Sequence, residues 1–548
     1  MTADVTHVPA THERPSATAG ALAGTGQLIR LALRRDRIVL PVWALVIAFL
    51  AASGASAYEA LYPDPAERAG LTASVAANPS FAIMFGPAYD LQTAGGFTAW
   101  RFGTIAALLT SLIAAFTVTR HTRQEEDTGR QELLSAAVVG RYAPLTAGVA
   151  TAGLFSVVTG VLLTAMIAGV GADVTGSVAF GAAVALCGLV FTGVAAVTAQ
   201  LAEYSRTANT LAGSTFGVLF LLRAAGDTSE AEWLSWLSPV GWVHRVRAFA
   251  ENEWWVLALP AATTLVLCAV AYALLPKRDV GMSLIPGRPG RATATPGLRT
   301  SLALSWRLHR GALIGWIVGF AVMGMLFGTL ASGVSDIMGD SAEMKQMLQQ
   351  MGGARGIEDA FLSSITGMIA MIGSMYAVQA TLRMRYEETA LRVEPLLTTG
   401  VGRLRWLGGH LLFVLAGTAA VLTVCAALLG VGYGLSSGDV GGEWPRVFGA
   451  TLAQLPAMWV VAGAAVLLFG LVPRATVAAW ALAAAFVLIS MFGPILDLPQ
   501  AVLNVSPFTH VPQLPHAEFT ATPLLWLTAT AAALVAVGVT SLRRRDIG

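Results

Sequence analysis

The chain has 548 residues, of which 55% are hydrophobic and 12% are charged, and its mean hydropathy is +0.66. Soluble domains usually contain about 25% charged residues, so this composition excludes an ordinary soluble protein and predicts an all-α polytopic membrane protein. The formal net charge of +2 gives no reason to expect nucleic acid as a partner.

The first part of the chain is polar and is followed by a basic amphipathic segment. Residues 1–24 lack the order of a cleaved signal peptide, in which a basic stretch precedes an apolar one, and we expect a disordered cytoplasmic tail. The segment LIRLALRRDRIVLPVW, which carries Arg34 and Arg37, then predicts an amphipathic helix ahead of the first membrane span. We call it the leading helix.

About twelve apolar runs follow, and a helix that crosses a bilayer needs about 20 mainly apolar residues. The predicted spans lie near residues 38–57, 102–119, 144–170, 178–199, 208–225, 255–275, 312–330, 361–382, 406–433, 447–470, 475–493 and 522–541. Cytoplasmic loops retain Lys and Arg, and the positions of these residues predict a multi-pass protein of the plasma membrane with both termini in the cytoplasm.

The loop after the second span is unusually rich in charge. It reads RQEEDTGRQELLSAAVVGR, residues 123–141, and its charged residues include Glu125, Glu126, Arg130 and Glu132. Acidic residues contribute little to membrane topology, so the charge of this loop needs another explanation. As a short helix, the segment can lie at the membrane surface and present ionic groups to the cytoplasm.

The same loop recurs in the second half of the chain. A shift of 262 positions aligns it without a gap with residues 385–403, where the matching residues are Glu387, Glu388, Arg392 and Glu394. A shift of 273 aligns the leading helix with a segment that carries Arg307 and Arg310, and a shift of 268 aligns Ser238-Pro239 with Ser506-Pro507.

These matches keep their order, and they predict two parallel repeats of six helices. The first repeat covers residues 25–275, the second covers 301–548, and a cytoplasmic linker rich in Pro, Gly and Arg, residues 276–300, joins them. Each repeat then has one leading helix and one charged loop on the cytoplasmic side.

The charged loops carry a family resemblance. The pattern Glu-x-x-x-Gly-Arg-x-Glu-Leu-Leu, followed by Gly-Arg, resembles the coupling helix of ABC-2 type transporter permeases. The leading helix and the Ser-Pro segment are also similar to that family, and the double arrangement resembles the actinobacterial exporter permeases of the polyketide-antibiotic or tetronasin type. The second loop departs from the pattern at Leu391, which aligns with Gly129, and at Pro395, which aligns with Leu133.

The resemblance implies that two copies of a soluble ABC ATPase dock on the two charged loops and bind ATP and magnesium. A Walker A loop needs Gly-Lys followed by Ser or Thr, but the two lysines, Lys277 and Lys345, lie in Pro-Lys-Arg and Met-Lys-Gln. We therefore expect no enzymatic activity, cofactor or metal in this chain by itself.

The resemblance also implies a substrate cavity formed by the second and fifth spans of each half. The apolar and aromatic candidates for its lining are Phe216, Phe220, Met368, Met371, Met375 and Phe486. Such side chains favour a bulky apolar or amphipathic substrate, such as an antibiotic or drug, although ordinary helix packing would use the same residues.

Two other functions fit the sequence less well. A proton-coupled transporter of the major facilitator type would carry Gly-x-x-x-Asp-x-x-Gly-Arg in the loop, but Arg123 replaces the first Gly and Asp127 lies one residue too close to Gly129. The predicted spans also contain few ionisable groups, chiefly Arg223 and His410. A membrane-embedded hydrolase is disfavoured because His-Glu-x-x-His and Gly-x-Ser-x-Gly patterns are missing.

Overall fold

The structure is a computed structural model, and every regular element in its described part is a helix. The described residues are 20–77, 79–135, 139–279, 281–285, 300–331, 354–492 and 499–545, with two isolated positions at 293 and 298. The chain forms two compact units, residues 1–289 and 290–548, and the boundary between them lies inside the predicted linker.

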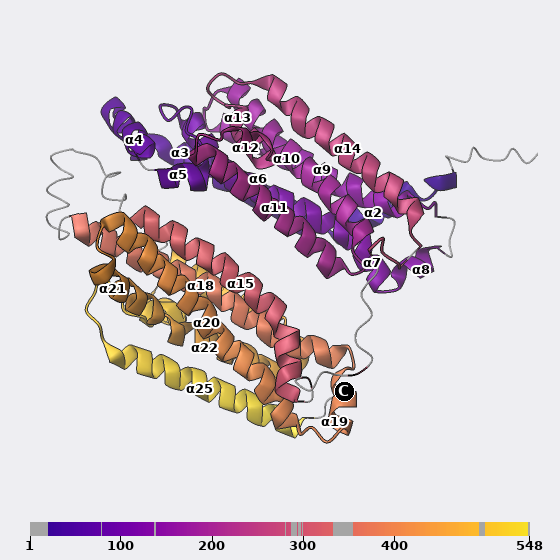
Figure 1. Cartoon of the computed structure of the whole chain (residues 1–548), viewed down its shortest axis with the longest axis vertical. Helices are drawn as coiled ribbons and strands as arrows, with labels where there is room; N and C mark the ends of the chain where they lie inside the picture. Colours follow the sequence, from indigo (N-terminus) through magenta and orange to yellow (C-terminus); the bar gives the residue numbers. More distant parts are fainter. Residues whose placement is uncertain are drawn as a thin grey trace, which may run out of the picture. The chain divides into compact units, whose positions relative to one another are not determined.

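The first unit is a bundle of long helices packed around α10 (Figure 1). Its long helices are α3 (Val39–Leu61), α6 (Ala94–His121), α9 (Ala143–Gly169), α10 (Val174–Leu201), α11 (Ser205–Thr228) and α14 (Ala258–Leu274). Small residues let α9 and α10 approach closely, since a Cβ atom on Gly160 would lie 2.5 Å from the carbonyl oxygen of Gly181.

Short helices lie at both ends of this bundle. Helices α2 (Thr25–Arg35), α7 (Arg123–Asp127) and α8 (Arg130–Ser135) lie at one end, which we call the loop end (Figure 1). The opposite end holds α4 (Pro65–Ala77), α5 (Pro79–Phe85), α12 (Trp233–Trp236) and α13 (Pro239–Arg245). Two 3-10 helices flank α14, namely η1 (Trp254–Leu257) and η2 (Leu275–Lys277).

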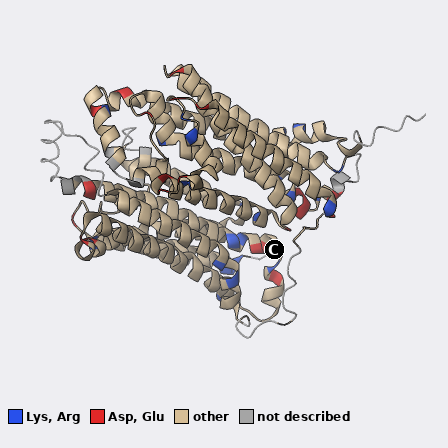
Figure 2. Cartoon of the chain, turned by 45° about the horizontal axis from the view of Figure 1, so that its top comes forward, with Lys and Arg blue, Asp and Glu red and all other residues tan. Residues whose placement is uncertain are grey.

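The second unit is a bundle in which α20 packs on α15 and α22 packs on α25. Its helices are α15 (Ser301–Ala331), α18 (Ala354–Thr389), α19 (Val393–Thr398), α20 (Arg403–Ser437), α21 (Val440–Leu452), α22 (Leu455–Leu471), η4 (Pro473–Ala475), α23 (Ala478–Phe492), α24 (Gln500–Leu503), η5 (Pro507–His510) and α25 (Ala521–Arg544). Figure 2 shows Lys and Arg gathered at the end of this unit that holds the C-terminus.

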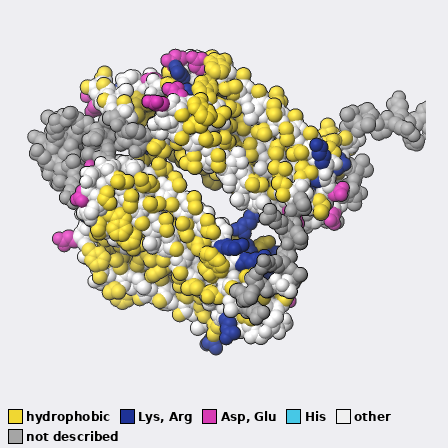
Figure 3. All heavy atoms as spheres, viewed as in Figure 1, with side chains coloured by type: hydrophobic (Ala, Val, Ile, Leu, Met, Phe, Trp, Pro, Cys, Tyr) yellow, Lys and Arg dark blue, Asp and Glu magenta, His cyan; other side chains and the backbone are white. Residues whose placement is uncertain are grey.

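Ten helices in the described part are long and apolar enough to cross a membrane. The two predicted spans that fall short are the fifth of each half: α11 is long enough but too polar, and α23 is apolar but has 15 residues. Hydrophobic side chains cover much of the visible surface along the long helices (Figure 3). The predicted fold class, an all-α polytopic membrane protein, is confirmed.

The leading helix differs between the two units. In the first unit α2 ends at Arg35 and is followed by Asp36, and α3 begins at Val39. The Asp36 carboxylate turns inward, where Arg120 and His121 each approach it to 2.6 Å. In the second unit His309 aligns with Asp36, and the leading segment continues without a break into the first span as α15.

Two predicted boundaries can be compared with the described residues. Residues 1–19 lie outside them, but the carbonyl oxygens of Ala21 and Ala23, which we assigned to the tail, accept hydrogen bonds from the backbone of Tyr142 and Gly140. Most of the predicted linker from 286 onward is also outside them. Its first part packs on the first unit, where the amide of Leu284 donates to the carbonyl oxygen of Gln200.

Candidate coupling site

The first charged loop is anchored by a buried arginine. Arg123 opens α7 directly after α6, and none of its side chain is exposed. Its Nε donates to the carbonyl oxygen of Ala202 at 2.6 Å, and its Nη2 donates to that of Met282 at 2.8 Å. The loop is therefore fastened both to the end of α10 and to the segment that follows α14.

Glu126 joins this arginine to a second one. Arg123 forms an ion pair with Glu126 one turn away, and Arg278 binds both carboxylate oxygens of Glu126, at 2.7 and 2.8 Å. Bidentate, charge-assisted pairs of this kind are among the stronger hydrogen bonds in proteins. We call Arg123, Glu126 and Arg278 the first trio.

The second unit contains an equivalent trio. Glu388 pairs with Arg385 at 3.2 Å, and Nη2 of Arg545 lies 2.9 and 3.0 Å from its two oxygens. Arg278 and Arg545 each follow the last long helix of their unit, and each is followed by an aspartate in the sequence. Our sequence reasoning missed these two arginines, although the shared Arg-Asp pair was the signal that could have identified them.

The neighbouring glutamates are also paired inside their own units. Glu125 lies 2.6 Å from Arg35 of α2 and 3.8 Å from Arg130. Glu387 lies 2.7 Å from Arg383 of α18 and 3.7 Å from Arg392. Arg130 and Arg392 are aligned residues, whereas Arg35 and Arg383 come from different elements. The glutamate keeps its position in both units while one of its partners changes.

The eight residues predicted for ATPase coupling therefore fall into two groups. The side chains of Glu125, Glu126, Glu387 and Glu388 are at most 10% exposed. The other four residues are exposed and lie on or directly before the short helices, namely Arg130, Glu132, Arg392 and Glu394. The first group can hold the loop in shape, and the second group is the one that a partner could touch.

The two sequence departures in the second loop leave its turn intact. Gly129 precedes α8 with a φ of 71°, and Leu391, which aligns with it, has a φ of 55°. Leucine therefore adopts the left-handed conformation that glycine adopts without strain. Pro395 is the third residue of α19, in the first turn, where the missing N–H costs no intrahelical hydrogen bond.

The leading-helix arginines Arg34, Arg37, Arg307 and Arg310 are all exposed. In the first unit, α2 contributes to the loop site through its next residue, Arg35, which pairs with Glu125. A described ion pair thus connects a leading helix with a charged loop. Among the residues that the structure describes, none of the four predicted arginines forms such a pair with a loop.

The candidate cavity residues lie in two places. Phe216 of α11 is buried against Phe191 of α10, with ring centroids 5.2 Å apart, and Phe220 lies under the guanidinium of Arg223. In the second unit α18 packs on α23, which places the helix of Met371 and Met375 beside that of Phe486. Met368 is 38% exposed, whereas Phe486 is buried. In the first unit α11 also packs on α6, so the helices of the predicted second and fifth spans are neighbours within each unit.

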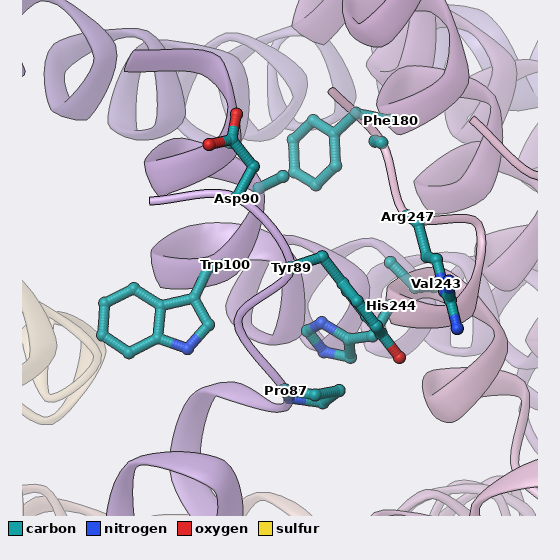
Figure 4. A pocket seen from close by; sticks show the side chains of 11 residues that line it. Pro87, Tyr89, Asp90, Trp100, Phe180, Val243, His244 and Arg247 are labelled. Carbon is teal, nitrogen blue, oxygen red and sulfur yellow. The ribbon is translucent and has the colours of Figure 1, made fainter. Parts of the chain in front are cut away.

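The opposite end of the first unit holds a small polar cavity of about 20 Å³ (Figure 4). Tyr89, Asp90, Trp100, His244 and Arg247 contribute to its lining, and Nε2 of His244 lies 2.9 Å from Oγ1 of Thr104. Burial, together with the nearby guanidinium of Arg223, lowers the pKa of His244 to about 3. Such a volume holds about one water molecule, so this cavity is too small for a drug-sized substrate.

The helices contain more buried acidic groups than the sequence suggested. Asp36 is buried near the loop end, and at the opposite end Asp227 accepts hydrogen bonds from Arg223 and Ser235. In the second unit Arg446 bridges Asp359 and Glu443. The pairs with Arg120, Arg223 and Arg446 compensate the charge of these carboxylates, as buried ions require.

The chain resembles proteins that are described as efflux permeases. Residues 298–543 match the family described as multidrug efflux system permease Rv1217c, C-terminal domain. The whole chain is 42% identical over 540 residues to the multidrug efflux system permease protein Rv1217c of Mycobacterium tuberculosis (strain ATCC 25618 / H37Rv), and the match covers 98% of each protein. The protein is therefore a multi-pass membrane permease that belongs to the Rv1217c family of ABC-type multidrug efflux permeases.

Proposed function

We propose that this chain is the complete membrane part of an ATP-driven exporter. It moves bulky apolar or amphipathic compounds, such as antibiotics and drugs, out of the cell. ATP and magnesium bind to a separate soluble ATPase, of which two copies dock on the two charged loops. Both termini, the loop ends and the linker face the cytoplasm.

The duplicated trio is the observation that carries this proposal. Each unit fixes a short charged segment by the same arrangement, a glutamate held between an arginine of the loop and an arginine beyond the last long helix. Isolated surface ion pairs stabilise little, but a paired and largely buried set fixes a backbone. Two loops fixed in the same way supply two docking surfaces, as two ATPase subunits require.

Two observations support a separate ATPase subunit. Neither lysine of the chain stands in a Walker A pattern, and the charged segments between the apolar helices are short. The related protein from Mycobacterium tuberculosis is named as the permease protein of an efflux system, which fits a subunit that works with another component.

The substrate class is suggested by the pairing of the second and fifth helices. Methionines on α18 and a phenylalanine on α23 belong to neighbouring helices, and Phe216 and Phe220 belong to α11, which packs on α6. Flexible thioethers and aromatic rings suit varied apolar surfaces better than sugars or inorganic ions. The name of the related protein, a multidrug permease, supports the same class.

Purification from native membranes tests the subunit arrangement. The mass of the complex should correspond to one copy of this chain and two copies of a protein with a Walker A motif. In liposomes, dye export should require ATP and should stop when the Walker A lysine of the partner is replaced by alanine. Export driven by a pH gradient with this chain alone would instead establish the proton-coupled alternative.

A further inference from the structure

The first unit has an apolar groove on the surface of its predicted spans, beside the leading helix. The groove has a volume of about 320 Å³, within the range of about 300–1,000 Å³ for small-molecule sites. Most of its wall comes from α3 and α9, and it includes Pro41, Leu45, Thr151, Leu154 and Val158. Its remaining lining residues, Leu33, Asp36 and Arg37, lie where α2 joins α3.

The groove is apolar along its length and basic at one end. Pro41, Leu45, Leu154 and Val158 are exposed, and they belong to helices that are long and apolar enough to cross a membrane. Arg37 is exposed and has no ion-pair partner among the described residues. Asp36, by contrast, is buried and its charge is already balanced by the ion pair with Arg120. The free charge at the groove is therefore positive.

The second unit carries aromatic side chains at two positions that align with groove residues. Trp306 aligns with Leu33, and Phe413 aligns with Thr151. The rings of Trp306 and Phe413 lie 5.8 Å apart, and His309, which aligns with Asp36, stacks on Phe413 at 5.5 Å. Aromatic rings that contact one another thus stand in the second unit where Leu33, Asp36 and Thr151 line the groove of the first unit.

We propose that this groove binds one acyl chain of an anionic phospholipid, with the phosphate at Arg37. An apolar trough beside a bilayer fits a hydrocarbon chain, and exposed arginines next to it attract anionic head groups. Arg34 and Arg30 extend the basic surface along α2. The bound lipid would hold α2 against α9 and, through the pair between Arg35 and Glu125, would stabilise the first charged loop.

Photolabelling in liposomes tests the proposal on the full-length chain. The probe is phosphatidylglycerol with a photoreactive group on one acyl chain, and the labelled peptides are identified by mass spectrometry. Label should concentrate on residues 40–45 and 154–162. Leu154→Trp, which changes an exposed wall residue, should lower this labelling about tenfold, because it displaces about two buried methylenes. Leu265→Trp, on the exposed face of α14, is the matched control and should not change it.

The head-group part has its own control. With Arg37→Gln the preference for phosphatidylglycerol over a phosphatidylcholine probe should disappear, whereas with Arg206→Gln, which changes an exposed arginine of α11 that does not line the groove, it should persist. The combined change of Trp306→Leu and Phe413→Thr should open a labelled groove in the second unit. Equal labelling of the Leu154→Trp and wild-type proteins would overturn the proposal. Displacement of the probe by an exported drug would also overturn it and assign the groove to substrate.

Discussion

The two loop ends hold equivalent glutamates whose arginine partners differ in burial. In the first trio the side chains of Arg123 and Arg278 are 0% and 4% exposed, and in the second those of Arg385 and Arg545 are 24% and 16% exposed. The first loop is also tied to the leading helix through Arg35, whereas Glu387 is paired within α18 and its own loop. The ionic arrangement is thus kept while its surroundings differ.

This difference in burial predicts that the two trios contribute differently to the free energy of unfolding. A buried ion loses its hydration, so removal of its partner is costly, while a partly exposed ion is rehydrated by water. The first trio should therefore be the stricter structural requirement. From the sequence, Leu391 and Pro395 suggested that the two loops differ in the short helix of the second loop. In the structure the larger difference is the burial of the arginines in the two trios.

The largest effect should come from breaking the first trio. Glu126→Gln leaves Arg123 and Arg278 without a carboxylate, and we expect a loss of about 3–5 kcal/mol in stability, as for other broken buried pairs. Glu388→Gln leaves more exposed arginines and should cost about 1–2 kcal/mol after screening by water. Thermal unfolding in nanodiscs measures both. Equal losses for the two variants would contradict the comparison.

The next largest effect should be a pH dependence of stability that arises from His244, at the end of the first unit opposite the loop end. The pKa of His244 is lowered to about 3 in the folded protein, so the unfolded chain takes up a proton below its ordinary value of about 6.5 while the folded chain does not. The contribution of His244 to the free energy of unfolding is therefore fully present above about pH 6.5 and is lost as the pH decreases toward 3. At pH 5 the loss from this residue should be about 2 kcal/mol.

A variant isolates this contribution from those of other groups. His244→Gln should show a smaller loss of unfolding temperature between pH 7.5 and pH 5 than the wild type. Pro512 of the second unit aligns with His244 at the shift of 268 that matches the Ser-Pro segments, so the second unit has no histidine at this position. An unchanged pH dependence in the variant would show that His244 is not the source.

A smaller effect should come from exchanging the turn residues of the two loops. Gly129→Leu introduces a side chain at a φ of 71° and should cost about 1–2 kcal/mol. Leu391→Gly removes the same strain but gives freedom to the unfolded chain, so it should stabilise by less than about 1 kcal/mol. Chemical denaturation of the two variants measures both changes. A destabilising Leu391→Gly would mean that the Leu391 side chain has a packing role that outweighs the strain.

Sequence reasoning predicted the helical membrane fold and the family, because apolar length and the order of motifs are properties of the chain itself. It could not predict which charged residues face inward. Glu125 and Glu132 belong to one short segment, yet the first is buried because Arg35, 90 positions away, reaches it. Likewise, Asp36 at the end of α2 meets His121, 85 positions away, and no local pattern encodes this contact.

The fifth spans show a different limit. A run of apolar residues predicted them, but α11 also contains Arg223, whose side chain is buried and donates to the carbonyl oxygens of Ala82 and Ile83. From sequence alone this arginine indicated an interfacial position. Its real role, fastening α5 to α11, depends on contacts across 140 positions of the chain.

The smallest effect on stability should come from changes to the exposed loop residues. These changes test ATPase docking most directly. Glu132→Lys and Glu394→Lys reverse charges at the surfaces of the two loops, and each should change stability by less than about 0.5 kcal/mol, as is usual for surface positions. If the loops dock two ATPases through ionic contacts, each change should weaken capture of the ATPase, and more so at low salt, where charges are less screened. Quantitative pull-down of the partner measures this.

Unlike the two trios, the exposed surfaces of the two loops should respond equally to charge reversal. Glu132 and Glu394 are both exposed, and each follows a residue in the left-handed conformation. Each single reversal should leave about one ATPase per chain, and the double reversal should leave none. Glu230→Lys, an exposed change at the opposite end of the first unit, is the control for net charge. If the double variant retained both ATPases and normal export, the exposed charges would not be docking contacts, and the buried trios would serve the fold alone.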